Sequence, residues 1–194
     1  THFFKEKAAA MIIRTLSAAS GFVPCCNGTL EGTVEQLDLA GIQHCAYLPI
    51  AVTPAQQRLV NDFAAEINGS HQGRVIAFGS LHPAAEDLEE EMKRIKDLGL
   101  AGIKFHPQYQ QVYIDDPKTE HMIRLAGEMG LPLLFHAGVD PGLPGPLYAP
   151  VEKIARLIDN LGDMQNITLI GAHLGGLLEW DAVEKLLVGS PMYL

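Results

Sequence analysis

Three histidines each end an apolar, strand-like run of the sequence. They are His106 in LAGIKFHP, His136 in LPLLFHAG and His173 in ITLIGAHLGG. In a barrel of parallel strands, the carboxyl ends of the strands meet on one face, and active sites are built from the residues there. Neutral imidazole is a good ligand for zinc and similar cations. Several histidines delivered to one face therefore indicate a metal site.

Such a site needs ligands from several strand ends. A catalytic metal usually takes three protein ligands and keeps one position for water, whose pKa it lowers to about 7. His136 and His173 fit this pattern, and His2 joins them if a strand ends just before it. The spacing is not a local motif such as HExxH. Each histidine therefore also has an ordinary interpretation as a hydrogen-bonded structural residue.

Lys104 and His106 should lie on the same face of the strand expected at 101–106, because side chains alternate along a strand. A lysine inside a barrel must pair with an anion, shift its pKa or contact an anionic ligand. We expect both residues to contact substrate or to support the metal ligands. A structural role for the pair is the alternative.

Other polar residues have weaker signals. His82 ends an apolar run in the same manner but is expected to cap a loop. Asp140 and Tyr148 lie in GVDPGLPGPLYAP, a Gly- and Pro-rich loop that could close over a substrate. Turn and packing roles are favoured for these two residues. The remaining histidines are expected on the surface, and they are His44, His71 and His121.

The elements that must position these residues alternate regularly. Apolar runs occur near 43–48, 74–80, 101–106, 132–136 and 167–172, and another begins at Met192. Helices are expected over 3–19, 54–68, 84–98 and 151–161, the last three from their apolar periodicity. Thr53 and Asp116 are placed to cap helices that begin with proline. Glycines that end helices stand at 41, 99, 130 and 162. This repetition predicts an α/β fold with a parallel sheet.

Unit count decides between two architectures. The chain holds about six βα units, whereas a complete (β/α)8 TIM barrel needs about 250 residues. We therefore expect residues 1–194 to form a single partial barrel domain, without most of its first strand and its last two units. The alternative is an open doubly wound sheet, but no GxGxxG motif links a strand to a helix.

Composition narrows the possible partners. With 194 residues, 47% of them hydrophobic, the chain can bury one substantial core. A net charge of −9 argues against nucleic acid, and no apolar run approaches the roughly 20 residues of a membrane span. Three cysteines make no disulfide framework, which predicts a cytoplasmic protein. A small-molecule substrate is the expected partner, and an incomplete barrel with open sheet edges could form a homo-oligomer.

The motifs GIKFHP, LPLLFHAG and ITLIGAHLGG, in this order, resemble the amidohydrolase superfamily. The similarity extends over essentially the whole chain and points to the amidohydrolase-related branch that includes aminocarboxymuconate-semialdehyde decarboxylase. It implies a barrel with one divalent metal, with zinc expected, manganese as the alternative and a second metal left open. By this resemblance, His2 is the second histidine of a His-x-His motif and His136 is the fifth-strand ligand. His173 is either a further metal ligand or the catalytic acid/base.

The resemblance implies a metal-dependent hydrolase acting on a small carbonyl- or carboxylate-containing substrate through metal-activated water. Non-oxidative decarboxylation on the same scaffold is the alternative, and a non-catalytic metabolite-binding barrel is the alternative from another class. Two departures stand out. The family's eighth-strand aspartate has no counterpart, and Lys5 stands where many members have proline. These 194 residues by themselves are therefore expected to be weakly active or inactive.

Overall fold

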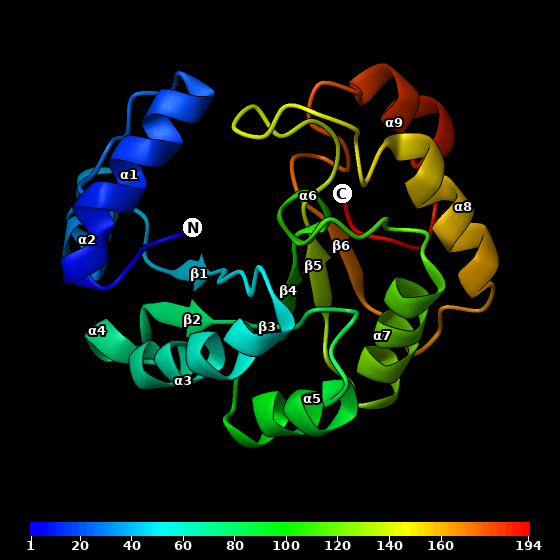
Figure 1. Ribbon diagram of the computed structural model, residues 1–194, viewed down its shortest axis with the longest axis horizontal. Helices are drawn as coiled ribbons and strands as arrows, with labels where there is room; N and C mark the ends of the chain where they lie inside the picture. The colour runs from blue at the N-terminus through cyan, green and yellow to red at the C-terminus, as the bar shows by residue number, and fades with distance from the viewer.

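The computed structural model describes residues 1–194, with parallel strands in the middle and helices around them (Figure 1). The strands are β1 Cys45–Tyr47, β2 Val75–Ala77, β3 Gly79–Ser80, β4 Ile103–Phe105, β5 Leu133–Phe135 and β6 Leu169–Gly171. The helices are α1 Glu6–Ser20, α2 Leu30–Leu39, η1 Pro54–Gln56, α3 Gln57–Ile67, α4 Ser70–Gly73, α5 Leu88–Asp97, α6 Pro107–Gln110, α7 Pro117–Glu128, α8 Val151–Leu161 and α9 Trp180–Leu186. No helix combines the length and apolar character that crossing a membrane requires.

Strand order follows the sequence. β2 pairs with β1, and β3, β4, β5 and β6 pair in turn, all in parallel. Only Phe78 separates β2 from β3: its N–H donates to Tyr47 O, while the next N–H, of Gly79, donates to Gly102 O. The run 75–80 is thus one strand that bonds β1 with its first half and β4 with its second. An open doubly wound sheet would reverse its strand order, so the barrel prediction is confirmed and the alternative is rejected.

The pairing continues to both ends of the chain. Thr1 N donates to Ala46 O at 2.7 Å, and Leu48 N donates to Thr1 O at 2.9 Å, so the first residues extend the sheet beside β1. At the other end, Tyr193 forms a parallel bridge with Ile170 of β6. The predicted six βα units therefore lie between adjacent segments of one curved sheet.

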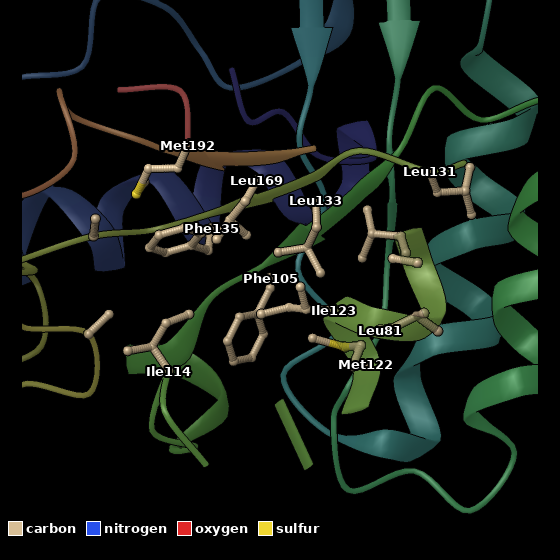
Figure 2. Packing of buried hydrophobic residues seen from close by; sticks show 14 of the residues in the cluster. Leu81, Phe105, Ile114, Met122, Ile123, Leu131, Leu133, Phe135, Leu169 and Met192 are labelled. Atoms are coloured by element: carbon tan, nitrogen blue, oxygen red, sulfur yellow. The ribbon is translucent and has the colours of Figure 1, made fainter. Parts of the chain in front are cut away.

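The two faces of the sheet have different surroundings. Phe105 and Phe135 point to the helices and are fully buried among residues such as Ile123 of α7 (Figure 2). Burying one such side chain contributes about 2–3 kcal/mol. On the opposite face, Leu134 and Ile170 are only half-buried. Alternation along the strands therefore directs their odd-numbered residues into the core and leaves the other face for the site.

Local signals mostly mark the element ends correctly. Asp116 Oδ1 accepts from Lys118 N at 2.9 Å, and Gln56 Oε1 accepts from Thr53 N at 3.2 Å, as expected for helix starts. The four predicted terminal glycines all have positive φ. Some boundaries were wrong: the helix expected over 3–19 begins at Glu6, because Phe3 is buried in the core. The helix expected over 84–98 begins at Leu88, and the one expected over 54–68 is divided into η1 and α3.

Candidate active site

Strand register brings His106 and His136 side by side. Phe105 of β4 pairs with Phe135 of β5, and each phenylalanine is followed by a histidine that points to the opposite face. The two imidazoles stack with their centroids 4.3 Å apart and their planes 13° apart. Both residues are buried. The contact follows from the spacing of neighbouring strands, which is close to 4.8 Å.

His173 reaches the same place from a turn after β6. Its backbone is left-handed, with φ of 61°, and its carbonyl accepts from Trp180 Nε1 at 3.3 Å. This turn directs the ring onto His136, where His173 Nε2 lies 3.1 Å from His136 Nδ1. The rings meet nearly edge to face, with centroids 4.7 Å apart. The structure thus brings together three histidines that are widely separated in sequence.

Hydrogen bonds define which nitrogen atoms are free. His136 Nε2 lies 3.2 Å from Val139 O, and because a carbonyl only accepts, this nitrogen carries the proton in the neutral ring. The lone pair is then on Nδ1, facing His173. His106 Nδ1 accepts from Tyr109 N at 3.4 Å, so in the neutral ring Nε2 carries the proton and faces Asp140 Oδ2, 3.6 Å away; a cation bound at Nε2 would require the other tautomer. Backbone partners of this kind orient the histidines that bind metals in proteins.

His106, His136 and Asp140 form a group that fits a divalent cation. One potential ligand atom from each lies within 4.8 Å of the other two. Asp140 is held by a turn in which Gly142 N donates to its Oδ1 at 2.8 Å. Two imidazoles and a carboxylate are suitable donors for zinc or manganese. The sequence favoured a turn role for Asp140, and the structure shows the turn but also places the carboxylate at the site.

The predicted ligand set was His2, His136 and His173. The structure brings His136 and His173 into contact but does not place His2 in the group of converging ligand atoms. His2 lies beside β1 on the N-terminal segment and is exposed. Its charge, when present, would lower the pKa of His136 slightly. The roles of His2 and His173 as metal ligands stay predictions.

Electrostatics keeps these imidazoles neutral. Burial lowers the pKa of His136 to about 3, with the Lys104 ammonium adding to the effect. Burial also takes the pKa of His106 far below its usual range, and neighbouring His136 and Lys104 lower it further. Loss of hydration and Lys104 lower the pKa of His2 to about 4, although part of this residue remains exposed. The pKa of His173 falls for the same two reasons. Neutral rings have the lone pairs that a metal needs.

Lys104 is the cation at the centre of this group. It is 2% exposed, and its ammonium has neither a hydrogen-bond nor an ion-pair partner. Burial lowers its pKa to about 7, while Asp140 opposes the shift. Because Lys104 lowers the pKa of all four site histidines, its ammonium must lie among them. The expectation that Lys104 and His106 share the inner face is confirmed, and their contact with substrate stays a prediction.

Several other expectations can be compared with the structure. His82 Nδ1 accepts from Ala84 N at 3.2 Å, which confirms its role as a loop cap. Tyr148 packs against Tyr113, with ring centroids 4.9 Å apart, so it has the packing role expected of it. Asp181 lies in the first turn of α9, whose N-cap is Glu179. The histidines expected on the surface are all exposed, namely His44, His71 and His121.

The sequence profile of the amidohydrolase family matches residues 43–188. This match spans most of the chain, and the chain belongs to the amidohydrolase family. The metal group and the strand-end histidines described above are consistent with membership. The family consists of metal-dependent enzymes, so the protein is a metal-dependent enzyme, either a hydrolase or a carboxy-lyase. No curated protein matches the chain.

Solved structures share the barrel fold at low sequence identity. A TIM-barrel protein of Bordetella bronchiseptica, the uncharacterized Bb4693, is 18% identical with a TM-score of 0.75, and the match covers 98% of this chain and 70% of that one. 5-Carboxyvanillate decarboxylase LigW of Sphingomonas paucimobilis is 16% identical with a TM-score of 0.58, and the match covers 100% of this chain and 74% of that one. A dihydroxybenzoic acid decarboxylase of Polaromonas sp. JS666, with bound manganese and 2-nitroresorcinol, is 20% identical with a TM-score of 0.59. That match covers 90% of this chain and 64% of the other. At these identities the likeness establishes the TIM-barrel fold.

Proposed function

We propose that the chain carries the metal-binding face of a decarboxylase that removes CO2 from a small hydroxylated aromatic acid without oxidation. The observation that supports this most directly is the buried Lys104 ammonium, which has no protein partner. With a divalent metal present, Asp140 alone cannot balance the positive charge of the site. Burying unbalanced charge is costly, so the site favours an anionic substrate. A carboxylate beside Lys104 satisfies this requirement.

The choice of decarboxylation over hydrolysis rests on the structural neighbours. They include 5-carboxyvanillate decarboxylase, and a 2,6-dihydroxybenzoate decarboxylase complexed with 2,6-dihydroxybenzoate. The dihydroxybenzoic acid decarboxylase with manganese and 2-nitroresorcinol belongs to the same group. All three act on aromatic rings that bear a carboxylate and hydroxyl or methoxy oxygens. We extend that substrate class to this chain.

The residues present suit a resident metal. His136 belongs both to the set predicted from the sequence and to the group that converges in the structure, so it is the central proposed ligand. His106 and Asp140 complete the structural group, and His2 and His173 remain the predicted additions. When bound, the metal would act as a Lewis acid on a substrate oxygen. Zinc is favoured by the nitrogen-rich donor set, while manganese is the ion found in a neighbouring structure.

Proton delivery is the task we assign to His173. Loss of CO2 breaks a carbon–carbon bond and leaves its electron pair on the ring carbon, which must receive one proton. His173 is more open than the other two rings and contacts His136 through Nε2. Its pKa is lowered by burial and then by Lys104. A substrate carboxylate paired with Lys104 would offset the second effect and help His173 to bind the proton that it delivers.

Hydrolysis is the second candidate function. A probable 2-pyrone-4,6-dicarboxylic acid hydrolase of Acinetobacter baumannii has a TM-score of 0.58 at 12% identity. In such a reaction, Asp140 beside His106 could accept a proton from attacking water. The substrate of that hydrolase is also a carboxylic acid, so Lys104 would keep the same role. The two candidates therefore differ in the bond broken rather than in how the substrate is held.

The experiment compares products. Protein stripped of metal and reloaded with Mn²⁺ or Zn²⁺ is incubated with hydroxybenzoates and with 2-pyrone-4,6-dicarboxylate, and CO2 release and ring opening are followed separately. We expect slow CO2 release from at least one hydroxybenzoate, in keeping with the weak activity expected of these 194 residues. This release should be lost in Lys104→Met and retained in Lys93→Met, which removes an exposed lysine of α5. Ring opening alone would identify a hydrolase, and carboxylate binding with neither turnover nor bound metal would identify a non-catalytic barrel. If elemental analysis finds no bound metal, both enzyme candidates fail.

Location and assembly complete the proposal. We infer a small-molecule substrate in the cytoplasm, since the thiols Cys25, Cys26 and Cys45 are unpaired. Self-association into a homo-oligomer is also proposed, because large apolar side chains remain exposed. Neither point affects the chemistry at Lys104 and the histidines.

A further inference from the structure

Gln110 has every polar atom of its side chain engaged beside the site. It ends α6, one helical turn after His106, and is 4% exposed. Its Oε1 accepts from His106 N at 2.8 Å. Its Nε2 donates to Ala51 O and to Leu81 O, both at 2.7 Å. A buried amide with all these bonds formed strongly restrains the groups that it joins.

These bonds join the carboxyl ends of different strands. Ala51 follows β1, Leu81 follows β3, and His106 follows β4. Ser80 adds a second connection, because its Oγ accepts from Ala51 N at 3.0 Å and donates to Lys104 O at 2.9 Å. The Ala51 backbone is therefore held at its N–H by Ser80 and at its carbonyl by Gln110.

The link matters because the site takes residues from strands on both sides of the run 75–80. His2 lies on the segment that pairs with β1, through the bond from Leu48 N to Thr1 O. His106 and His136 follow β4 and β5, and β1 has no direct pairing with β4. Between them runs only the strand that contains β2 and β3. Gln110 bridges this strand at the end that faces the site.

We infer that Gln110 is a positioning residue that holds His106 in place relative to the segment after β1 and so maintains the arrangement of the metal-binding face. The consequence for metal binding rests on the proposed function, whereas the coupling of the strand ends does not. Nothing in this role requires Gln110 to touch substrate or metal. Its effect is transmitted through the peptide groups of His106 and Ala51.

The test replaces Gln110 by methionine, which keeps the approximate volume and removes all three bonds. In metal-free protein, we expect hydrogen exchange at the His106 amide and across residues 48–52 to become about fivefold faster, as loss of a bond worth about 1 kcal/mol predicts. In a Mn²⁺ titration by calorimetry, we expect binding about tenfold weaker than in the control variant.

Gln57→Met is the matched control. Gln57 is also buried, donates from Nε2 to Asp87 Oδ1 at 2.7 Å and accepts from His82 N at 3.3 Å. Its loss should lower the melting temperature in a similar way but leave the exchange of His106 and 48–52, and the Mn²⁺ affinity, unchanged. If Gln110→Met does not fold, Gln110→Asn serves instead, because a shorter amide cannot reach all three partners.

The outcomes are distinguishable. Unchanged exchange at His106 and 48–52 in a folded Gln110 variant overturns the inference. If exchange becomes faster but the Gln110 variant binds Mn²⁺ as tightly as Gln57→Met does, Gln110 does not position the metal site and is a purely structural residue. If the wild-type chain binds no Mn²⁺, the proposed function fails, and the exchange data still decide whether Gln110 couples the strand ends.

Discussion

At the scale of single residues, Lys104 is an amine whose positive charge has no hydrogen-bond or ion-pair partner in the folded chain, and burial lowers its pKa to about 7. Removing the hydration of an ammonium costs several kcal/mol unless an anion replaces the lost water. Asp140 is the only carboxylate that raises the pKa of Lys104, and burial still prevails. Lys104 therefore destabilises the protein in the absence of substrate. A residue of this kind is retained for binding rather than for folding.

This argument predicts that Lys104→Met stabilises the metal-free protein. Methionine fills a similar volume without a charge, so we expect unfolding to become about 1–3 kcal/mol less favourable, which corresponds to a melting temperature higher by about 3–8 °C. Scanning calorimetry measures the change, with Lys93→Met as the exposed control that should stay within about 0.5 kcal/mol of wild type. A lower melting temperature for Lys104→Met would show that the ammonium has a structural partner.

His82 provides a prediction for pH. Burial lowers its pKa below the value of about 6.5 found in unfolded chains. As pH falls, the unfolded chain takes up this proton first, so the stability contributed by neutral His82 is complete above about pH 6.5 and lost below it. His82→Asn keeps an acceptor for Ala84 N but cannot titrate. We therefore expect a smaller fall in melting temperature from about pH 7 to about pH 5 than in wild type.

The control for that comparison is His121→Asn, which changes an exposed histidine of α7. It should leave the pH dependence as it is in wild type. An identical pH dependence in His82→Asn and wild type contradicts the prediction.

The site could be predicted from the sequence only where a strand end marked it. His106, His136 and His173 each follow an apolar run, and the structure brings all three together. No such signal marked Asp140 as a site residue, because Asp140 lies in a loop whose path depends on tertiary contacts. Its position four residues after His136, on the face where the strands end, was the available clue. Which atoms would converge on a metal depends on strand register, which the sequence does not specify.

At the scale of elements, the turn after β6 combines strain with function. His173 and Leu174 have φ of 61° and 56°, a left-handed conformation that is uncommon for residues other than glycine. Gly175 and Gly176 follow; a side chain on Gly175 would collide with Leu194, and one on Gly176 with Val183. No sequence signal indicated that His173 itself would adopt the strained conformation. Propensity alone cannot predict a backbone state that packing imposes.

Trp180 is the residue that tests this turn. Its indole N–H donates to the His173 carbonyl at 3.3 Å, and it is the single tryptophan of the chain. We expect Trp180→Phe to lower kcat for the proposed reaction about threefold to tenfold, with little change in KM, since the lost bond is worth about 1 kcal/mol and acts on proton delivery. Leu186→Ala, an exposed change on the same helix, should leave kcat unchanged.

Fluorescence gives a second measurement for this prediction. Because Trp180 is the only indole, wild-type emission reports on the turn that carries His173. Addition of Mn²⁺ should quench it, and the quenching should disappear when His136 is replaced by alanine. If Trp180→Phe leaves kcat unchanged and Mn²⁺ does not quench the wild-type emission, Trp180 has no role in positioning His173.

At the scale of the whole molecule, the architecture was the most predictable level. Alternating apolar runs and amphipathic helices require a parallel sheet covered by helices, and the structure confirms it. The division of run 75–80 was not predictable, since it arises where Phe78 bonds toward β1 and Gly79 toward β4. That change of partner reflects the curvature of the entire sheet. It lies beyond any local property of those residues.

The distribution of exposed apolar side chains is another property of the whole molecule. Several gather in the last part of the chain, around α9, and we call them the α9 patch: Leu174, Leu178, Trp180, Leu186, Val188 and Tyr193. Val188 alone is 65% exposed. Solvated apolar side chains concentrated in one region favour association. Val23, in the loop after α1, is exposed as well. The α1 and α2 helices that this loop joins lie on the other side of the molecule from α9 (Figure 1).

We therefore predict that this chain self-associates through the α9 patch. Leu186→Glu combined with Val188→Lys places charges in this patch without changing the core or the histidines. Burying an unpaired charge in an interface costs at least about 1.4 kcal/mol. The dissociation constant of the oligomer should therefore rise about tenfold or more. Sedimentation velocity over a concentration series measures the shift. Val23→Lys is the control and should associate like wild type. A wild-type chain that stays monomeric at all concentrations, or equal effects of the control and the patch variant, refutes this interface.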